Sequence, residues 1–212
     1  MYVGRIVAVG KNSAGANAVM YRVSSRSFPN REAVENNGIL AVVPRQGFEG
    51  DIKKNPYIAY NALRLVGDWA IATNGSHTDP IAEKVAMGMP MREALALSLL
   101  ALDYEKDDFN TPRIAAAVPV TGDVGWLAIV RKDALIVREV ALHAGQALYL
   151  ATYEADDVRD SQVSEFDANT PDGAAEFVIS GGLFANLDKP VTSAAALMND
   201  TGFALGTYRV EA

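Results

Sequence analysis

The order of strand-like and helix-like segments constrains the fold of this chain more than any other feature of its sequence. Short runs rich in β-branched and aromatic residues, bounded by turn residues, predict three blocks of strands, and two segments with helical spacing separate these blocks. The strands that we expect cover residues 2–9, 18–23, 39–43, 57–65, 68–73, 113–118, 124–130, 134–140, 146–153 and 203–210. The order β, α, β, α, β predicts an α+β protein with two mainly antiparallel sheets covered by two helical layers.

The two helical sections are each interrupted by helix-breaking residues. The first covers residues 79–102, and a glycine and a proline at 88–90 divide it in two. The second covers about 173–199, with breaks at 181–182 and 189–190. The leucines of the first section recur at helical spacing, which indicates a helical layer packed on a sheet rather than a surface that binds a partner.

The composition limits the kinds of site that the chain can form. Its 212 residues, half of them hydrophobic, suffice for one globular domain, so we expect a single domain over 1–212. A formal charge of −7 disfavours nucleic acid as a partner, so any bound anion requires a local cluster of arginines. With no cysteine and two histidines, the chain lacks thiolate ligands and a histidine-rich zinc site. We expect neither a metal nor another cofactor.

The hydropathy pattern gives no sign of secretion or membrane insertion. The first ten residues lack the basic start, apolar stretch and cleavage site of a secretory signal, and they resemble a strand. The most apolar stretch, residues 94–102, is much shorter than the roughly 20 residues of a membrane-spanning helix. We therefore expect a cytoplasmic protein without a membrane partner.

The most informative segment is 21–31, where arginines and serines gather at the point at which a strand gives way to a loop. Guanidinium groups together with hydroxyls suit a phosphate, because they supply charge-assisted hydrogen bonds in the geometry that its oxygens accept. The candidate residues are Arg22, Ser24, Ser25, Arg26 and Arg31. A phosphate or carboxylate site is the favoured interpretation, and a solvated strand end whose arginines pair with surface carboxylates is the alternative.

A second polar cluster lies at 55–61. Strand alternation places Tyr57 and Asn61 on one face and Tyr60 on the other, so only one of these faces can line a pocket. Tyrosines in strands are usually core or interface residues. The sequence alone therefore favours a structural role for this cluster.

Two further polar clusters lie at junctions between predicted elements. Residues 73–79, with Asn74, Ser76 and His77, precede the first helix and could either hold substrate oxygens or simply begin the helix. Residues 103–113, with Glu105 and Arg113, join a helix to a strand, and a carboxylate there could serve as a general base. Acidic loops are usually only solvated, and the residues alone favour that interpretation.

With these clusters in view, the chain resembles the archaeal-type IMP cyclohydrolase family. The opening Met-Tyr-Val-Gly-Arg and the segment 21–31 are the most specific points of similarity. Shorter similarities occur at 57–61, 73–77, 103–105 and 111–114, and the resemblance extends over nearly the whole chain.

The resemblance implies a four-layer αββα fold like that of the N-terminal nucleophile hydrolases. It also implies the reversible cyclisation of the formylated aminoimidazole carboxamide ribonucleotide to IMP and water, a purine-nucleotide reaction that needs no metal or redox cofactor. Hydrolases of that superfamily use an amino-terminal Cys, Ser or Thr as nucleophile, whereas this chain begins Met1-Tyr2, which disfavours a self-processing amidohydrolase.

Our hypothesis assigns roles on the basis of this resemblance. Catalysis would involve Tyr57 or Tyr60 together with Glu105 for proton transfer, and Arg26. Substrate binding would involve Arg22, Ser24, Ser25, Arg31, Asn61, Asn74, Ser76 and Arg113. Arg22, Arg26 and Arg31 would hold the phosphate and nearby oxyanions, and Arg113 would hold either Glu105 or the substrate.

Two other functions remain open. A sensor that binds a purine nucleotide without catalysis would keep the arginines and dispense with Tyr57 and Glu105. An amidohydrolase of the same fold would require a processed chain that begins at an internal Ser or Thr. A separate formyl-transfer domain of about 100 to 200 residues does not fit within the length, and we expect a symmetric homo-oligomer.

Overall fold

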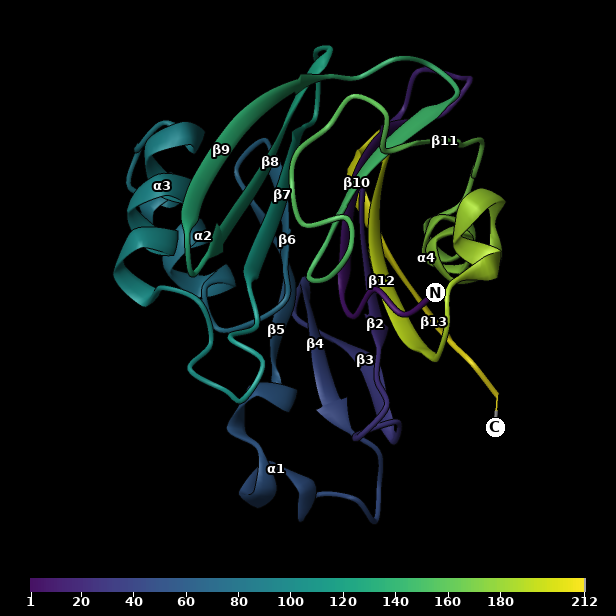
Figure 1. Cartoon of the computed structure of the whole chain (residues 1–212). Helices are drawn as coiled ribbons and strands as arrows, with labels where there is room; N and C mark the ends of the chain where they lie inside the picture. The colour runs from purple at the N-terminus through teal and green to yellow at the C-terminus, as the bar shows by residue number, and fades with distance from the viewer. Residues whose placement is uncertain (212) are drawn as a thin grey trace.

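Two antiparallel sheets stacked face to face form the body of the protein (Figure 1). The computed structural model describes residues 1–211. The six-stranded sheet has the order β11-β10-β1-β2-β12-β13, with β1 at Ile6–Lys11, β2 at Asn17–Ser24, β10 at Gln146–Ala151, β11 at Val163–Glu165, β12 at Pro190–Asn199 and β13 at Gly202–Arg209. All neighbouring strands in it pair antiparallel.

The seven-stranded sheet follows chain order, β3-β4-β5-β6-β7-β8-β9, and is also antiparallel throughout. Its strands are β3 at Arg31–Asn36, β4 at Ile39–Pro44, β5 at Tyr60–Val66, β6 at Trp69–Thr73, β7 at Arg113–Pro119, β8 at Val124–Arg131 and β9 at Ala134–Ala141. An α+β protein with two antiparallel sheets, as the sequence predicts, is confirmed.

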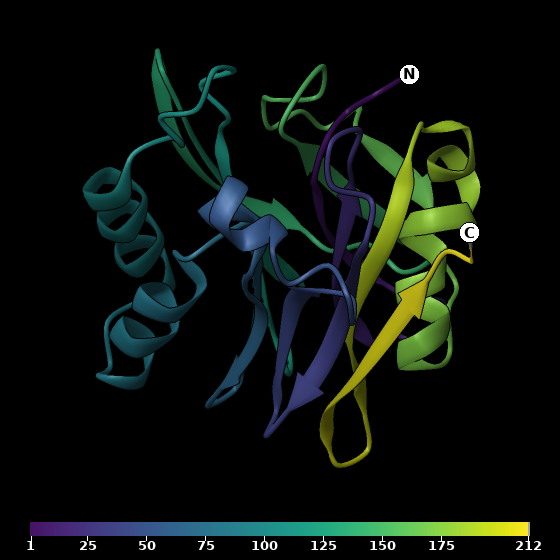
Figure 2. The same cartoon turned by 90° about the horizontal axis from the view of Figure 1, so that it is seen from below.

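The helices lie on the outer faces of the two sheets (Figures 1 and 2). Helices α2, Thr78–Ala86, and α3, Met91–Leu102, pack on the seven-stranded sheet, and α4, Pro171–Ser180, packs on the six-stranded sheet. The short helix α1, Asp51–Lys54, lies at the end of the molecule that faces the viewer in Figure 2. Within residues 1–211, no helix combines the length and the apolar character needed to cross a membrane.

The alternation of side chains along β2 divides neighbouring residues between two layers. Val19 and Tyr21 belong to the core between the sheets, whereas Met20 packs in the core beneath α4. Arg22, next to Tyr21, points to the α4 side as well, because successive side chains of a strand point to opposite faces. Residues adjacent in the polar segment 21–31 therefore belong to different parts of the structure.

The predicted second helical section, 173–199, is wrong in its second half. Only α4 and a 3₁₀ segment, Gly182–Asn186, are helical there, and Pro190–Asn199 forms β12. This strand lies between β2 and β13, and consecutive residues such as Ala194 and Ala195 are buried, one against each core. A strand buried on both faces loses the alternation that identifies a strand in a sequence, and its alanines resemble a helix.

The predicted strand 57–65 begins later than expected. Tyr57 lies in a 3₁₀ turn, Pro56–Ile58, whose first N–H groups are capped by Asn55: its Oδ1 accepts a hydrogen bond from the N–H of Tyr57 at 2.8 Å. The strand β5 starts at Tyr60. Three elements are absent from the sequence-based prediction: β3, which is polar, and β11 and α1, which have only three and four residues.

Candidate active site

A cavity of about 390 Å³ lies where four segments converge: the amino-terminal residues, the loop after β2, the loop after α3 and the loop after β10. Asn55, which directly follows α1 at the near end of Figure 2, completes its wall. The lining residues are Tyr2, Arg5, Ser25, Arg26, Ser27, Phe28, Asn55, Asp107, Phe109, Thr111, Tyr153 and Glu154. Aromatic rings, two arginines and several hydroxyl groups thus face one space.

The loop after β2 presents an arginine, Arg26, that forms no ion pair within the described part of the chain, residues 1–211. Ser25 Oγ accepts a hydrogen bond from the N–H of Phe28 at 3.0 Å and so shapes the loop. Arg26 is exposed, and its guanidinium carbon lies 4.0 Å from the centre of the Tyr2 ring. Behind the loop, buried Arg31 donates to the carbonyl of Phe28 at 3.1 Å, and burial lowers the pKa of Arg31. Neither arginine forms an ion pair with any of residues 1–211, so both charges are available to an anion.

A pair of buried tyrosines lies between the sheets near this loop. The hydroxyl groups of Tyr21, from β2, and Tyr60, from β5, are 2.5 Å apart, and their rings meet edge to face. Burial raises the pKa of Tyr21 well above its ordinary value, and the neighbouring Tyr60 adds to this effect. Tyr21 therefore stays protonated near neutral pH, so the pair can donate a hydrogen bond to an oxygen on which charge develops.

Glu105 is a buried carboxylate held between two arginines. Its Oε2 accepts a hydrogen bond from Arg5 Nη2 at 3.2 Å, and its Oε1 lies 3.7 Å from Arg113 Nη1. Arg113 is fixed in turn by donation from Nε to the carbonyl of Asp103 at 2.8 Å. Burial raises the pKa of Glu105, and the two guanidinium groups oppose that effect. Through Arg5, this ion-pair chain reaches the cavity wall.

The structure places Arg22 and Ser24, predicted to bind the phosphate, away from the candidate cavity. The Arg22 guanidinium is fully buried under α4 and donates to the carbonyls of Val178, Ile179, Phe184 and Leu187 at 2.8 to 3.2 Å. Its Nε donates to Ser24 Oγ at 2.9 Å, so both side chains are occupied on the face opposite the cavity. Burial lowers the pKa of Arg22 to about 10, which leaves it charged near neutral pH. Both side chains thus join β2 to α4 and the following 3₁₀ segment.

Five other predicted substrate ligands do not line the cavity: Arg31 and Arg113, which are buried behind it, and Asn61, Asn74 and Ser76. Asn61 donates to the carboxylate of Asp79 at the start of α2, at 3.0 to 3.1 Å. Asn74 is fully buried, and its amide bonds to the carbonyl of Pro112 and the N–H of Ile114 at 2.9 and 2.8 Å, so it joins the ends of β6 and β7. Ser76 is exposed and does not line the cavity. The predicted contacts of these side chains with substrate are therefore not supported.

Tyr57 occupies an intermediate position. Its ring centre lies 5.8 Å from the guanidinium carbon of Arg113, which places it beside the Glu105 ion-pair chain rather than beside Tyr60. The structure thus brings together Ser25, Arg26 and Arg31 on one side, with Tyr60 and Glu105 nearby.

The sequence analysis missed Arg5, Tyr21 and Tyr153 as site residues. Arg5 lies two residues before Val7 and four before Val9, whose side chains point into the core between the sheets. By strand alternation Arg5 points the same way, and a charged residue that faces a core could have identified it as a site residue. Tyr153 donates to or accepts from Thr111 Oγ1 at 2.8 Å, a contact between segments 42 residues apart that no local pattern reveals.

His77 is buried and neutral, which predicts an acid-sensitive fold. Burial lowers its pKa to about 3 from an ordinary value of 6.5, so between these values the unfolded chain binds a proton that the folded chain does not. Stability should therefore decline as the pH falls below about 6.5, by at most roughly 1.4 kcal/mol per pH unit from this group. Urea unfolding at several pH values should show a shallower decline for His77→Gln, whereas the exposed His143→Gln should follow the wild type. Equal slopes in all three proteins would contradict the prediction.

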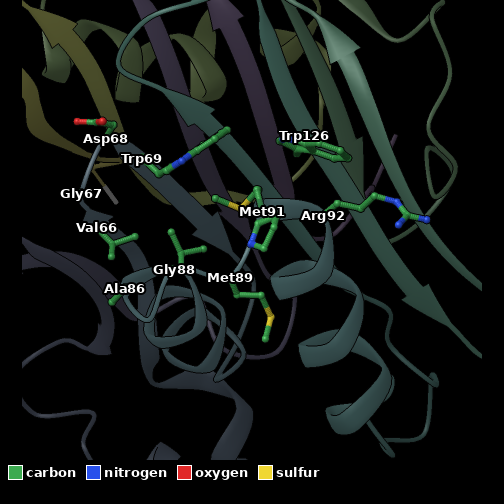
Figure 3. Close-up of a pocket in the computed structure, with 12 residues that line it drawn as sticks. Val66, Gly67, Asp68, Trp69, Ala86, Gly88, Met89, Met91, Arg92 and Trp126 are labelled. Atoms are coloured by element: carbon green, nitrogen blue, oxygen red, sulfur yellow. The ribbon is translucent and has the colours of Figure 1, made fainter.

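A larger cavity, about 690 Å³, lies on the outer side of the seven-stranded sheet (Figure 3). The indoles of Trp69 and Trp126 and the side chains of Met89 and Met91 line it. Its charged residues, Asp68 and Arg92, are both exposed and lie on the rim. None of the predicted site residues lines this larger cavity. The smaller cavity, which Ser25 and Arg26 line, is therefore the candidate active site.

The geometry defines the class of protein. Arg26 and Arg5 line the smaller cavity, and Arg5 connects its wall to the buried Glu105 carboxylate and lies near the buried tyrosine pair. This arrangement is suited to acid–base chemistry on a small anionic molecule. Within residues 1–211, no group of three His, Asp or Glu side chains could hold a metal ion.

Comparison with known proteins agrees with this class. The model of the IMP cyclohydrolase-like protein family matches residues 2–202. The IMP cyclohydrolase of Methanosphaera stadtmanae is 47% identical over 200 residues, 94% of this chain and 96% of that protein. That of Methanococcus maripaludis is 47% identical over 98% of this chain and 100% of that protein. That of Natronomonas pharaonis is 43% identical over 100% of this chain and 100% of that protein. The chain belongs to the IMP cyclohydrolase-like family.

Proposed function

We propose that this protein is an IMP cyclohydrolase. It would interconvert the formylated aminoimidazole carboxamide ribonucleotide and IMP plus water, the final step of de novo purine biosynthesis. One observation supports this most directly: Arg26 lies without a carboxylate partner among residues 1–211, at the mouth of a cavity whose wall contains Arg5 bound to Glu105. The mouth can hold a phosphate while the deeper groups act on the base.

The phosphate is proposed to bind at the loop after β2. Arg26 supplies a guanidinium fork, Arg31 adds positive charge from behind, and the hydroxyl of Ser25 and the loop N–H groups supply further donors. The sugar and imidazole then extend inward, toward Arg5 and the tyrosine pair. Tyr2, whose ring stacks near Tyr153, forms an apolar wall for the planar base.

The reaction requires proton transfer at two places. In the forward direction the carboxamide nitrogen attacks the formyl carbon and loses a proton, and the formyl oxygen becomes a hydroxyl group. The hydroxyl group then takes up a proton and leaves as water. The formamido nitrogen loses its proton, and the C=N bond forms between this nitrogen and the former formyl carbon. We assign the proton acceptor to Glu105 and hydrogen-bond donation to the developing oxyanion to Tyr60, supported by Tyr21, with Arg113 holding Glu105 and Tyr57 beside Arg113.

The wider assignments belong to the same proposal. The two helix-covered sheets are proposed to be a four-layer αββα sandwich of the N-terminal nucleophile hydrolase type, formed by a single domain over residues 1–212. We further propose a cytoplasmic homo-oligomer that binds a purine nucleotide and uses no cofactor. The order of the layers in Figure 1 supports the fold assignment.

The test is an ultraviolet assay of IMP formation from the formylated ribonucleotide, without folate or metal, for the wild type, Arg26→Ala and Arg92→Ala. The wild type should turn over, and Arg26→Ala should lose about 10- to 100-fold in kcat/KM, the effect of one charge-assisted hydrogen bond. Arg92 is an equally exposed arginine on the rim of the other cavity, so its variant should match the wild type.

Two other outcomes have distinct meanings. Binding of the nucleotide by calorimetry without turnover would favour a purine-nucleotide sensor. The absence of both binding and turnover would refute the proposed function. An intact mass that shows processing to an internal Ser or Thr would point to an amidohydrolase.

A further inference from the structure

Three buried polar atoms converge on the backbone of Gly75, in the loop between β6 and α2. A methyl group added at Gly75 would lie 2.7 Å from Arg113 Nη1, 3.4 Å from His77 Nδ1 and 3.6 Å from Glu105 Oε1. Among residues 1–211, none of these three atoms has a hydrogen-bond partner. Buried polar atoms without partners are uncommon, and three around one point mark a place with a specific function.

Gly75 is required by space rather than by backbone conformation. Its φ lies outside the left-handed region that favours glycine, so other residues could adopt the same backbone. The methyl group of an alanine would instead strike the end of the Arg113 side chain. The glycine therefore leaves room for one particular position of the Arg113 guanidinium.

His77 presents a lone pair to the same space. Its Nε2 lies 2.9 Å from the carbonyl of Ile114, which can only accept, so Nε2 carries the proton and Nδ1 is an acceptor. Burial and the nearby Arg113 charge lower the pKa of His77 and keep the ring neutral. A neutral acceptor here attracts the Arg113 guanidinium and adds no positive charge beside Glu105.

We propose that Gly75 and His77 are positioning residues: they fix the Arg113 guanidinium beside Glu105 and thereby set the position and proton affinity of that carboxylate. The inference rests on the proposed function, in which Glu105 accepts a proton. Arg113 faces Glu105 from β7, Arg5 faces it from the amino-terminal segment, and Arg31 and Asp107 contribute charge from β3 and the loop after α3. Of these, Arg113 is the group whose Nη1 lies nearest to the space beside Gly75, which His77 Nδ1 also faces.

The test is the pH profile of kcat/KM for Gly75→Ala. The clashing atom is the end of a flexible side chain, so the variant should fold, with Arg113 displaced. Losing a positive charge close to Glu105 should move the acidic limb of the profile upward by about one pH unit or more and lower kcat several-fold. Gly50→Ala is the matched control, because Gly50 has open space around it and an ordinary φ of −62°.

A double-mutant cycle separates this role from a general structural one. If Gly75 acts through Arg113, adding Gly75→Ala to Arg113→Met should change kcat/KM by less than about twofold, although it is harmful in the wild type. Equal effects in both backgrounds would overturn the proposal. Should Gly75→Ala fail to fold, His77→Gln is the second variant: its amide nitrogen can keep the bond to the Ile114 carbonyl while Nδ1 is lost, and the same upward shift is expected.

A measurement without substrate distinguishes failure of this inference from failure of the proposed function. The carboxyl carbon of Glu105 can be titrated by NMR in ¹³C-labelled protein, with Glu105→Gln to assign the signal. Its midpoint should be higher in Gly75→Ala than in the wild type, whatever reaction the protein catalyses. An unchanged midpoint would overturn the inference even in an active enzyme, whereas an inactive wild type with a shifted midpoint would overturn the proposed function alone.

Discussion

Glu105→Gln should lower kcat for IMP formation by a factor of about 10² to 10⁴, the usual contribution of a general base. The substituted amide has nearly the same shape, and its oxygen can still accept the hydrogen bond from Arg5, so the fold should persist. The amide cannot accept a proton, however. In the wild type, kcat/KM should rise with pH through the pKa of Glu105, which burial raises, and activity should be lost as the pH falls below it.

The comparison requires a carboxylate far from the cavity. Glu83, an exposed residue of α2 that forms no ion pair with the rest of residues 1–211, gives the matched variant Glu83→Gln, which should keep wild-type kinetics. The acidic limb of the pH profile should disappear in Glu105→Gln alone. Turnover close to that of the wild type would remove Glu105 from proton transfer and leave it the role of holding Arg5.

The strands were predictable from sequence where β-branched and large apolar residues are dense and the ends are marked by turns, even when both faces are buried. The hairpin of β1 and β2 has this form: Asn12 Oδ1 accepts from the N–H of Ala16 at 2.8 Å, and Gly15 takes a positive φ. The strand β12 was not predictable, because the run of small residues at its centre, Ser193 to Ala196, lacks the β-branched and aromatic side chains that mark β1 and β2. Its identity depends on the neighbouring strands β2 and β13, which only the folded chain brings to it.

The candidate site was predictable in part for a related reason. The segment 21–31 indicated an anion site, but strand alternation separates Tyr21 from Arg22, and the correct division could have been drawn from the pattern alone. Asn74 illustrates a different limit: its amide bonds to β7, about 40 residues away in the chain. Polar residues that link distant strands look the same in a sequence as polar residues that bind a ligand.

Arg22→Met should destabilise the protein by about 5 kcal/mol, a large share of the roughly 5 to 15 kcal/mol typical of a domain. Methionine fills the space but donates no hydrogen bond, so four buried carbonyls at the end of α4 and in the following 3₁₀ segment lose the guanidinium, although that of Phe184 keeps the N–H of Leu187. Each buried acceptor without a partner costs about 1 to 3 kcal/mol, and the costs are not fully additive. For a chain of this size, the melting temperature should fall by roughly 10 to 20 °C.

This prediction separates the two roles considered for Arg22. If the side chain binds phosphate, Arg22→Lys should keep the melting temperature. KM should rise, because lysine binds phosphate as a single point charge and lacks the two-pronged guanidinium. If it joins α4 to β2, Arg22→Lys should melt several degrees lower with an unchanged KM in the folded fraction, because one ammonium cannot reach carbonyls on both sides of the guanidinium. Arg26→Ala should show the opposite pattern, with normal melting and weaker substrate binding, since Arg26 is exposed and its guanidinium lies over the Tyr2 ring at the cavity wall. Measuring both quantities for both arginines therefore tests the structural division of segment 21–31, and a normal melting temperature for Arg22→Met would contradict it.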